Sequence, residues 1–158
     1  MNYVVDTNVA IAANGRDTHA SHECQYRCID FLQRLAEKDG AHEVFLDEDG
    51  TIMDQYADYL NFRGQPGVGD LFFRYLHDHM YANGRVRRVS VTRLNDDTRG
   101  FAELPPNDLD RADRVFLAVA VAHGPTIVNA LDSDWHERRV LTTELGVHVL
   151  ELCPDHVT

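Results

Sequence analysis

Residues 2–8 read NYVVDTN, an apolar and β-branched run that stops at Asp6. Such a run is typical of a buried strand, because β-branched side chains fit the pleated surface of a sheet. An aspartate directly after a buried strand is costly to bury without a partner. A second run of this kind, Thr126–Leu131, leads straight into Asp132. We therefore expect both aspartates at the carboxyl ends of strands, on one rim of a sheet.

Five segments have the composition of strands, and helical patterns separate them. Alternating strands and helices predict βαβ crossovers, and hence a parallel sheet with helices on both faces. The predicted fold is a three-layer α/β/α domain with a central parallel sheet of about five strands. The strands are expected at Asn2–Val5, His42–Leu46, Arg85–Val91, Thr126–Leu131 and Val147–Leu152. The helices are expected near Ala20–Lys38, Ile52–Leu60, Gly69–Tyr81, Leu109–His123 and Trp135–Leu145.

The length of 158 residues fits one domain, residues 1–158, with a sizeable core. No apolar run approaches the length of a membrane span, so we expect no membrane association. The N-terminal stretch has no basic region, and Asp6, Thr7 and Asn8 interrupt its apolar run, which argues against a signal peptide. We expect a cytoplasmic protein.

The net charge of −11 argues against a protein that binds nucleic acid tightly through a basic face. Carboxylates grouped around divalent ions lower the net charge, and the bound ions restore positive charge locally. Arg16, Arg93 and Arg114 are candidate phosphate contacts by chain position, although solvated surface arginine is the favoured interpretation of each.

Two of the three cysteines, Cys24 and Cys28, lie four residues apart on one face of a predicted helix. A zinc half-site is compatible with this spacing, and so are two small apolar residues on a buried helix stripe. The second interpretation is favoured, because the only further cysteine, Cys153, lies far along the chain.

Carboxylates recur near the predicted rim. Asp110 and Asp113 lie three residues apart in the helix that precedes the fourth strand, so they share a face. Hard oxygen ligands favour Mg²⁺ or Mn²⁺ over zinc, and such ions promote hydrolysis of phosphodiesters. Aspartate is also a common helix cap and turn residue. The combination of Asp6, Asp113 and Asp132 favours a metal site over separate caps.

Three segments together resemble the PIN-domain family. They are VVDTNV at 4–9, ADRVFLAVAVA at 112–122 and TIVNALDSDW at 126–135, and their order and spacing carry a resemblance that covers almost the whole chain. PIN domains are metal-dependent nucleases that act most often on RNA, and many small bacterial members are toxins of toxin–antitoxin pairs. The resemblance implies an endoribonuclease with RNA as substrate, an antitoxin protein as partner, and self-association into a homodimer.

The resemblance also implies roles for single residues. Asp6, Asp113 and Asp132 would be metal ligands, and Asp134 would be a ligand or a supporting carboxylate. Asn8 would orient Asp6 or contact phosphate.

One position departs from the family pattern. PIN domains supply a Glu ahead of a Tyr in the helix after the second strand, whereas Gln55 precedes Tyr56 here. The neutral carbonyl of Gln weakens metal binding and proton removal. Asp54 replaces the Glu only if the helix register shifts, and Asp47 and Asp58 are further candidates. The departure motivates an alternative function, a catalytically impaired PIN-like module that acts as a binding or regulatory partner.

Two other enzyme classes place an aspartate after the first strand. A phosphoryl-receiver domain needs a lysine late in the chain, but the only lysine is Lys38. A haloacid-dehalogenase-type phosphatase needs an aspartate two positions after its nucleophile, where Asn8 stands. Both classes fit the sequence less well than a metal-dependent nuclease.

Overall fold

The computed structural model describes residues 1–37, 41–61, 63, 65–81 and 84–157. All neighbouring strands of its five-stranded sheet pair in parallel, in the order β3-β2-β1-β4-β5. Each strand overlaps a predicted one. The parallel pairing of all neighbouring strands confirms the predicted parallel sheet. The strands are β1 (Asn2–Val5), β2 (Glu43–Asp47), β3 (Val86–Val89), β4 (Thr126–Asn129) and β5 (Val149–Glu151).

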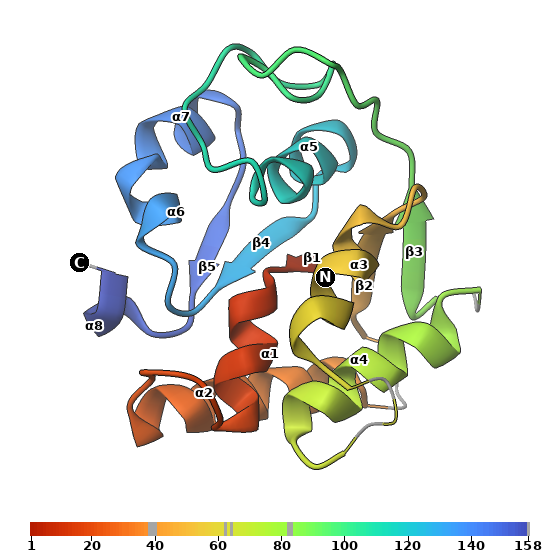
Figure 1. Cartoon of the computed structure of the whole chain (residues 1–158), viewed down its shortest axis with the longest axis vertical. Coiled ribbons are helices and arrows are strands. Elements are labelled where there is room, and N and C mark those ends of the chain that lie inside the picture. The colour runs from red at the N-terminus through yellow and green to blue at the C-terminus, as the bar shows by residue number, and fades with distance from the viewer. Residues whose placement is uncertain (38–40, 62, 64, 82–83, 158) are drawn as a thin grey trace.

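Helices cover the sheet on both sides. Figure 1 shows α1, α2 and α4 on one side of the sheet and α5, α6 and α7 on the other, which confirms the three-layer α/β/α prediction. Among the described helices, none combines the length and the hydropathy needed to cross a membrane. The helices are α1 (Thr7–Asn14), α2 (His22–Leu35), α3 (Thr51–Tyr59), α4 (Val68–His79), α5 (Arg114–His123), α6 (Ser133–Glu137), α7 (Arg139–Glu144) and α8 (Pro154–Val157).

Helix α1 was not predicted from the sequence. Its buried residues Thr7, Val9, Ala10, Ala12 and Ala13 lie on several sides of the helix, so it has no single apolar stripe to reveal a helical period. The helix begins after its N-cap Asp6 and ends at Gly15, whose φ of 69° lies in the left-handed region that favours glycine.

Two predicted helices have different bounds. The helix expected from Leu109 begins only at Arg114, because the Arg114 guanidinium binds the Leu109 carbonyl and the Asn107 side chain accepts from the Leu109 N–H. The helix expected from Trp135 to Leu145 is interrupted at Arg138, where φ is −100° and ψ is 22°. The predicted end of the first predicted helix, Lys38, lies outside the described residues.

The cysteine prediction was partly wrong. Cys24 on α2 forms a disulfide with Cys153, which directly precedes α8, across a sequence separation of 129. Cys28 is a free, fully buried thiol, as expected of a small apolar side chain, and burial raises its pKa to about 12. The spacing of Cys24 and Cys28 carried no information about Cys153, since that pairing is set by the tertiary fold.

The strand order predicts where the sheet would bind a ligand. From β1 the chain continues outward through β2 and β3, then returns to the other side of β1 with β4 and β5. Strand order therefore reverses between β1 and β4. Open parallel sheets bind ligands in the crevice outside the carboxyl ends of the strands at such a point. Asp6 follows β1 directly, and Asp132 lies three residues beyond β4.

Candidate metal centre

Three aspartates converge at this crevice. One carboxylate oxygen from each of Asp6, Asp113 and Asp132 lies within 4.8 Å of the other two. Asp6 caps α1, Asp132 caps α6, and Asp113 directly precedes α5. Asp6 and Asp113 are buried, with 4% and 6% of their surface exposed, and Asp132 is half-buried. We call these residues the carboxylate triad.

Hydrogen bonds restrain two of the three carboxylates. Asp6 Oδ2 accepts from Trp135 Nε1 at 2.8 Å, and Asp6 Oδ1 accepts from the Asn8 backbone N–H at 3.3 Å. Asp132 Oδ1 accepts from the Asp134 backbone N–H at 2.9 Å. By contrast, Asp113 Oδ2 is buried and has no hydrogen-bond partner in the part of the chain that the structure describes. Buried polar atoms normally have a partner, so this oxygen keeps an unused capacity to accept a bond.

Burial and mutual repulsion perturb the acidity of the triad. Burial, followed by the charges of Asp6 and Asp132, raises the pKa of Asp113 to about 10. Burial also raises the pKa of Asp6, against the opposing hydrogen bond from Trp135, and the charge of Asp132 raises it further. A divalent cation would remove this repulsion, because its charge favours all three carboxylates in their ionised form.

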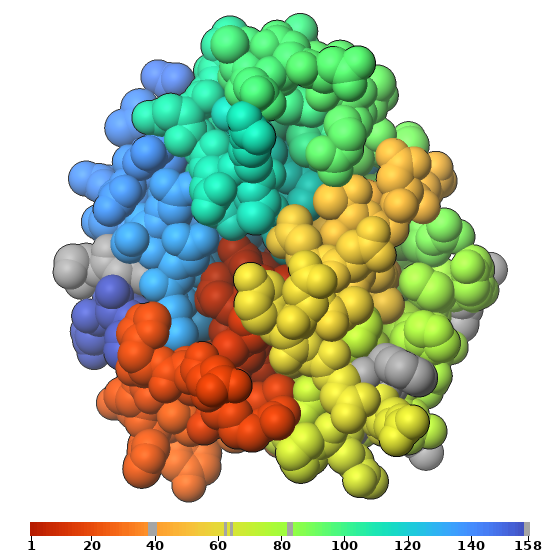
Figure 2. Space-filling model, viewed as in Figure 1, coloured from red at the N-terminus to blue at the C-terminus, as the bar shows by residue number. Residues whose placement is uncertain are grey.

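The triad lies in an open cavity of about 350 Å³. Figure 2 shows the hollow near the centre of the visible face, where the red N-terminal segment lies between segments coloured cyan, yellow and blue. Among the described residues that line the cavity there is no lysine or arginine. The other lining residues are Thr7, Asn8, Ile11, Asp17, Thr18, His19, Gln55, Tyr59, Ala112 and Leu131.

Gln55 lines the cavity, and Asp54 does not. Gln55 Nε2 donates to the carbonyl of Ala112, the residue before Asp113, at 2.8 Å. Asp54, the residue before Gln55 in α3, is exposed and is not among the described residues that line the cavity. Asp47 accepts from backbone N–H groups at the start of α3, so it serves as a helix cap. Asp58 lines an adjoining cavity, whose lining shares Ile11, Asp17 and Tyr59 with that of the triad's cavity. None of these three aspartates is among the described residues that line the triad's cavity.

Asp134 and Asn8 both lie beside the triad. Asp134 Oδ2 accepts from the Asp110 backbone N–H at 3.2 Å, and Asp134 Oδ1 lies 3.5 Å from a guanidinium nitrogen of Arg138. It is therefore engaged beside the triad, while Asp110 is exposed. The backbone N–H and the side chain of Asn8 both lower the pKa of Asp6 by hydrogen bonding. The Oδ1 of Asn8 accepts from the backbone N–H groups of residues 130 and 131.

The three candidate phosphate-binding arginines are engaged elsewhere. Arg16 pairs with the buried Asp70 at 2.7 Å. Arg93 donates to Thr51 Oγ1 and stacks over the Phe101 ring. Arg114 is buried and donates to backbone carbonyls of the segment that precedes α5. The favoured interpretation of exposed surface arginine was therefore wrong for Arg114.

Sequence reasoning missed two polar residues that adjoin the triad. Asn129, the last residue of β4, is fully buried, and its Nδ2 donates to Oε2 of Glu151 at 2.8 Å. Burial, together with the charges of Asp132 and Asp6, raises the pKa of Glu151. Glu151 is the last residue of β5. The rule that pointed to Asp6 and Asp132, a polar residue at the carboxyl end of a strand, applies equally to Glu151.

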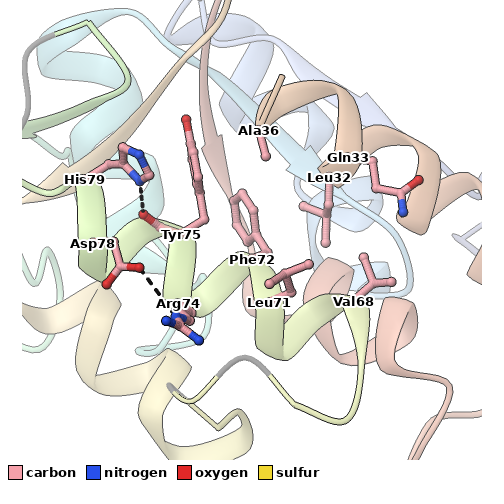
Figure 3. Close-up of a pocket in the computed structure, with 10 residues that line it drawn as sticks. All are labelled: Leu32, Gln33, Ala36, Val68, Leu71, Phe72, Arg74, Tyr75, Asp78 and His79. Atoms are coloured by element: carbon pink, nitrogen blue, oxygen red, sulfur yellow. Dashed lines mark hydrogen bonds and ion pairs between the residues drawn. The ribbon is translucent and has the colours of Figure 1, made fainter. Parts of the chain in front are cut away.

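A second cavity, of about 310 Å³, lies between α2 and α4 and has a different character. Figure 3 shows Leu32, Val68 and Phe72 on its walls. An ion pair between Arg74 and Asp78 lies among the lining residues. No residue is shared with the lining of the triad's cavity, and among the described residues no cluster of three or more potential metal ligands occurs there.

The triad thus combines oxygen ligands, burial and an open approach from solvent, which suits a hard divalent cation better than zinc. The donor set fits Mg²⁺ or Mn²⁺, and the unpartnered oxygen of Asp113 is the observation that tests this fit. Comparisons of the chain with protein-family models, with curated proteins and with solved structures found no match.

Proposed function

We propose that this chain is a metal-dependent endoribonuclease of the PIN-domain type, with Mg²⁺ or Mn²⁺ held by Asp6, Asp113 and Asp132. The unpartnered, buried Oδ2 of Asp113 within the triad carries the proposal. Two unit charges 4.8 Å apart repel by about 3 kcal/mol at an effective dielectric constant of about 20. A fold that holds three carboxylates at or below this separation is best explained by a cation that binds between them.

The chemistry follows from the surroundings of the triad. A bound divalent ion supplies Lewis-acid stabilisation for charge that develops on a phosphate. Because no lysine or arginine lines the cavity among the described residues, a phosphodiester approaches this acidic surface only with cations present. His19 and Tyr59 line the walls beside the triad and offer rings against which an unpaired base can stack.

RNA as the substrate, rather than DNA, rests on the resemblance of the three sequence segments to PIN domains. The same resemblance supports an antitoxin partner and a homodimer as parts of the proposal, and we further propose a cytoplasmic site of action.

A second candidate function is favoured by one observation. The position that carries a glutamate in PIN domains holds Gln55, whose amide donates to the Ala112 carbonyl. This contact leaves the triad without a fourth carboxylate from α3. It favours a PIN-like module that has lost catalysis and acts as a binding or regulatory partner.

Cleavage of a fluorescent panel of RNA and single-stranded DNA tests the proposal. The purified protein is assayed with Mn²⁺, Mg²⁺ or EDTA, beside the variants Asp6→Asn and Asp113→Asn and the exposed control Asp54→Asn. Metal-dependent RNA cleavage that both triad variants lose and the control retains is the expected result. Unchanged cleavage by the triad variants contradicts the proposed site. Folded wild-type protein that cleaves nothing favours the non-catalytic module.

A further inference from the structure

Asn129 makes the most complete set of side-chain contacts next to the triad. Its Oδ1 accepts from Asn8 Nδ2 at 2.9 Å and from the Asp132 backbone N–H at 3.2 Å. Its Nδ2 donates to the Asp132 carbonyl and to Glu151 Oε2, both at 2.8 Å. A primary amide has two donor hydrogens and two acceptor lone pairs. All four are used, so this fully buried side chain has a single favourable orientation.

The loop that carries Asp132 leaves the sheet directly after Asn129. Strand β4 pairs with β1 and β5 only through residues 126–129. Beyond them, the N–H groups of Ala130 and Leu131 donate to Asn8 Oδ1 at 2.9 Å, and the N–H of Asp132 donates to Asn129. Three consecutive backbone donors therefore bond to two side-chain amides, and the sheet itself does not hold this loop.

We propose that Asn129 is the positioning residue of the carboxylate triad. It holds the backbone of Asp132 at both its N–H and its carbonyl group, and through Asn8 it ties that backbone to the helix that Asp6 caps. The inference rests on the proposed function, because its main consequence is the affinity of the triad for metal. Groups that orient metal ligands typically change metal affinity by roughly 10- to 100-fold when they are removed.

Two substitutions probe this role. Asn129→Ala removes all four hydrogen bonds and leaves the residues of the triad unchanged. Asn129→Asp keeps the volume but loses both donor hydrogens, and it places a carboxylate against Glu151 Oε2 and the Asp132 carbonyl. Ile127→Ala is the matched control, because Ile127 is fully buried in the same strand and opens a destabilising cavity without touching either amide.

Two measurements apply to each variant, at a temperature where it remains folded. The first is the Mn²⁺ affinity by titration calorimetry, which we expect to fall roughly 10- to 100-fold in both Asn129 variants and to change little in Ile127→Ala. The second is acrylamide quenching of Trp135, the only tryptophan, in EDTA. Trp135 follows this loop in the chain, and its buried ring donates a hydrogen bond to Asp6. If the Asn129 variants free the loop, acrylamide reaches the ring more easily, so quenching should increase in these variants alone.

The outcomes separate this inference from the proposed function. Wild-type protein that binds Mn²⁺, with equal affinity in the Asn129 variants, overturns the positioning role and leaves the nuclease proposal intact. Wild-type protein that binds no Mn²⁺ contradicts the nuclease proposal. In that case the quenching of Trp135 decides: an increase confined to the Asn129 variants supports the positioning role, and an increase equal to that of Ile127→Ala, or none, overturns it. If Asn129→Ala does not fold, Asn129→Asp carries the test.

Discussion

Replacing Asp113 by Asn is expected to stabilise the metal-free protein and to abolish its response to Mn²⁺. The side chain of Asp113 is buried, and its Oδ2 has no partner among the described residues. Asn has nearly the same shape but carries no charge, so the substitution relieves the repulsion from Asp6 and Asp132. It also removes one of the three oxygen ligands that a cation needs.

The magnitude follows from the pKa of Asp113, which burial and the neighbouring charges raise from 3.8 to about 10. The folded protein therefore retains a proton that the unfolded chain releases above pH 3.8. The stability that the protonated Asp113 contributes is fully present below pH 3.8. As the pH rises, this stability falls by about 1.4 kcal/mol per pH unit until the pH passes the pKa of Asp113 in the folded protein. At pH 7 the loss reaches about 4 kcal/mol.

A neutral Asn does not incur this loss, although it cannot reproduce every contact of a protonated acid. We therefore expect Asp113→Asn to raise the free energy of unfolding at pH 7 by about 2 to 4 kcal/mol. For a chain of this length, that gain corresponds to roughly 5 to 15 °C in the midpoint of thermal unfolding.

Thermal unfolding in EDTA, followed by circular dichroism between about pH 5 and pH 8, measures this effect. The gap between Asp113→Asn and wild type is expected to widen as the pH rises. Added Mn²⁺ is expected to raise the midpoint of the wild type alone. Asp54→Asn, an exposed substitution on α3, is the control and should follow the wild type in both buffers. A variant that is less stable than wild type at pH 7 in EDTA refutes the argument that charge repulsion strains the metal-free site.

Three further predictions concern other parts of the molecule. Reduction with a dithiol, or Cys153→Ala, should lower the free energy of unfolding by up to about 5 kcal/mol, since the disulfide to Cys24 spans 129 residues. Denaturation curves that are identical with and without dithiothreitol contradict this prediction. Paramagnetic Mn²⁺ should quench the fluorescence of Trp135, whose Nε1 donates to Asp6, and Mg²⁺ should not; equal quenching by both ions argues against binding at the triad. Gln55→Glu, which adds a further carboxylate to the cavity beside the three of the triad, should raise Mn²⁺ affinity roughly tenfold, equivalent to about 1.4 kcal/mol; unchanged affinity in calorimetry means that residue 55 does not reach the metal.

The sequence predicted those features that depend on local pattern and on the direction of parallel strands. The apolar runs located every strand, and the rule about carboxyl ends of strands placed Asp6 and Asp132 at one rim. The quarter-turn between adjacent helical residues separated Gln55, which lines the cavity, from Asp54, which is exposed. These inferences need only the period of an element and its direction.

The features that the sequence did not reveal depend on contacts between distant segments. The disulfide of Cys24 and Cys153, and the bond between Asn8 and Asn129, join residues more than a hundred positions apart. Asn129 is the last residue of β4, but the apolar run of the sequence continues through Ala130 and Leu131, so the sequence placed it inside the predicted strand. Helix α1 was not predicted because its side chains are buried on several sides of the helix. It therefore lacks the polar stripe by which an amphipathic helix is recognised.

The contacts around the triad divide its members into two kinds. Asp6 is held by Trp135 and by the start of α1, and Asp132 is held through its backbone by Asn129. These contacts hold the two carboxylates near each other, and the charge of Asp132 raises the pKa of Asp6. Asp113, whose Oδ2 has no bond among the described residues, is the group that responds, by retaining a proton up to about pH 10. Carboxylate ligands bind metal in their ionised form, so a cation at the proposed site must displace the proton of Asp113. Under the proposed function, the amides that hold Asp6 and Asp132 in place also hold the ligand oxygens ready for that cation.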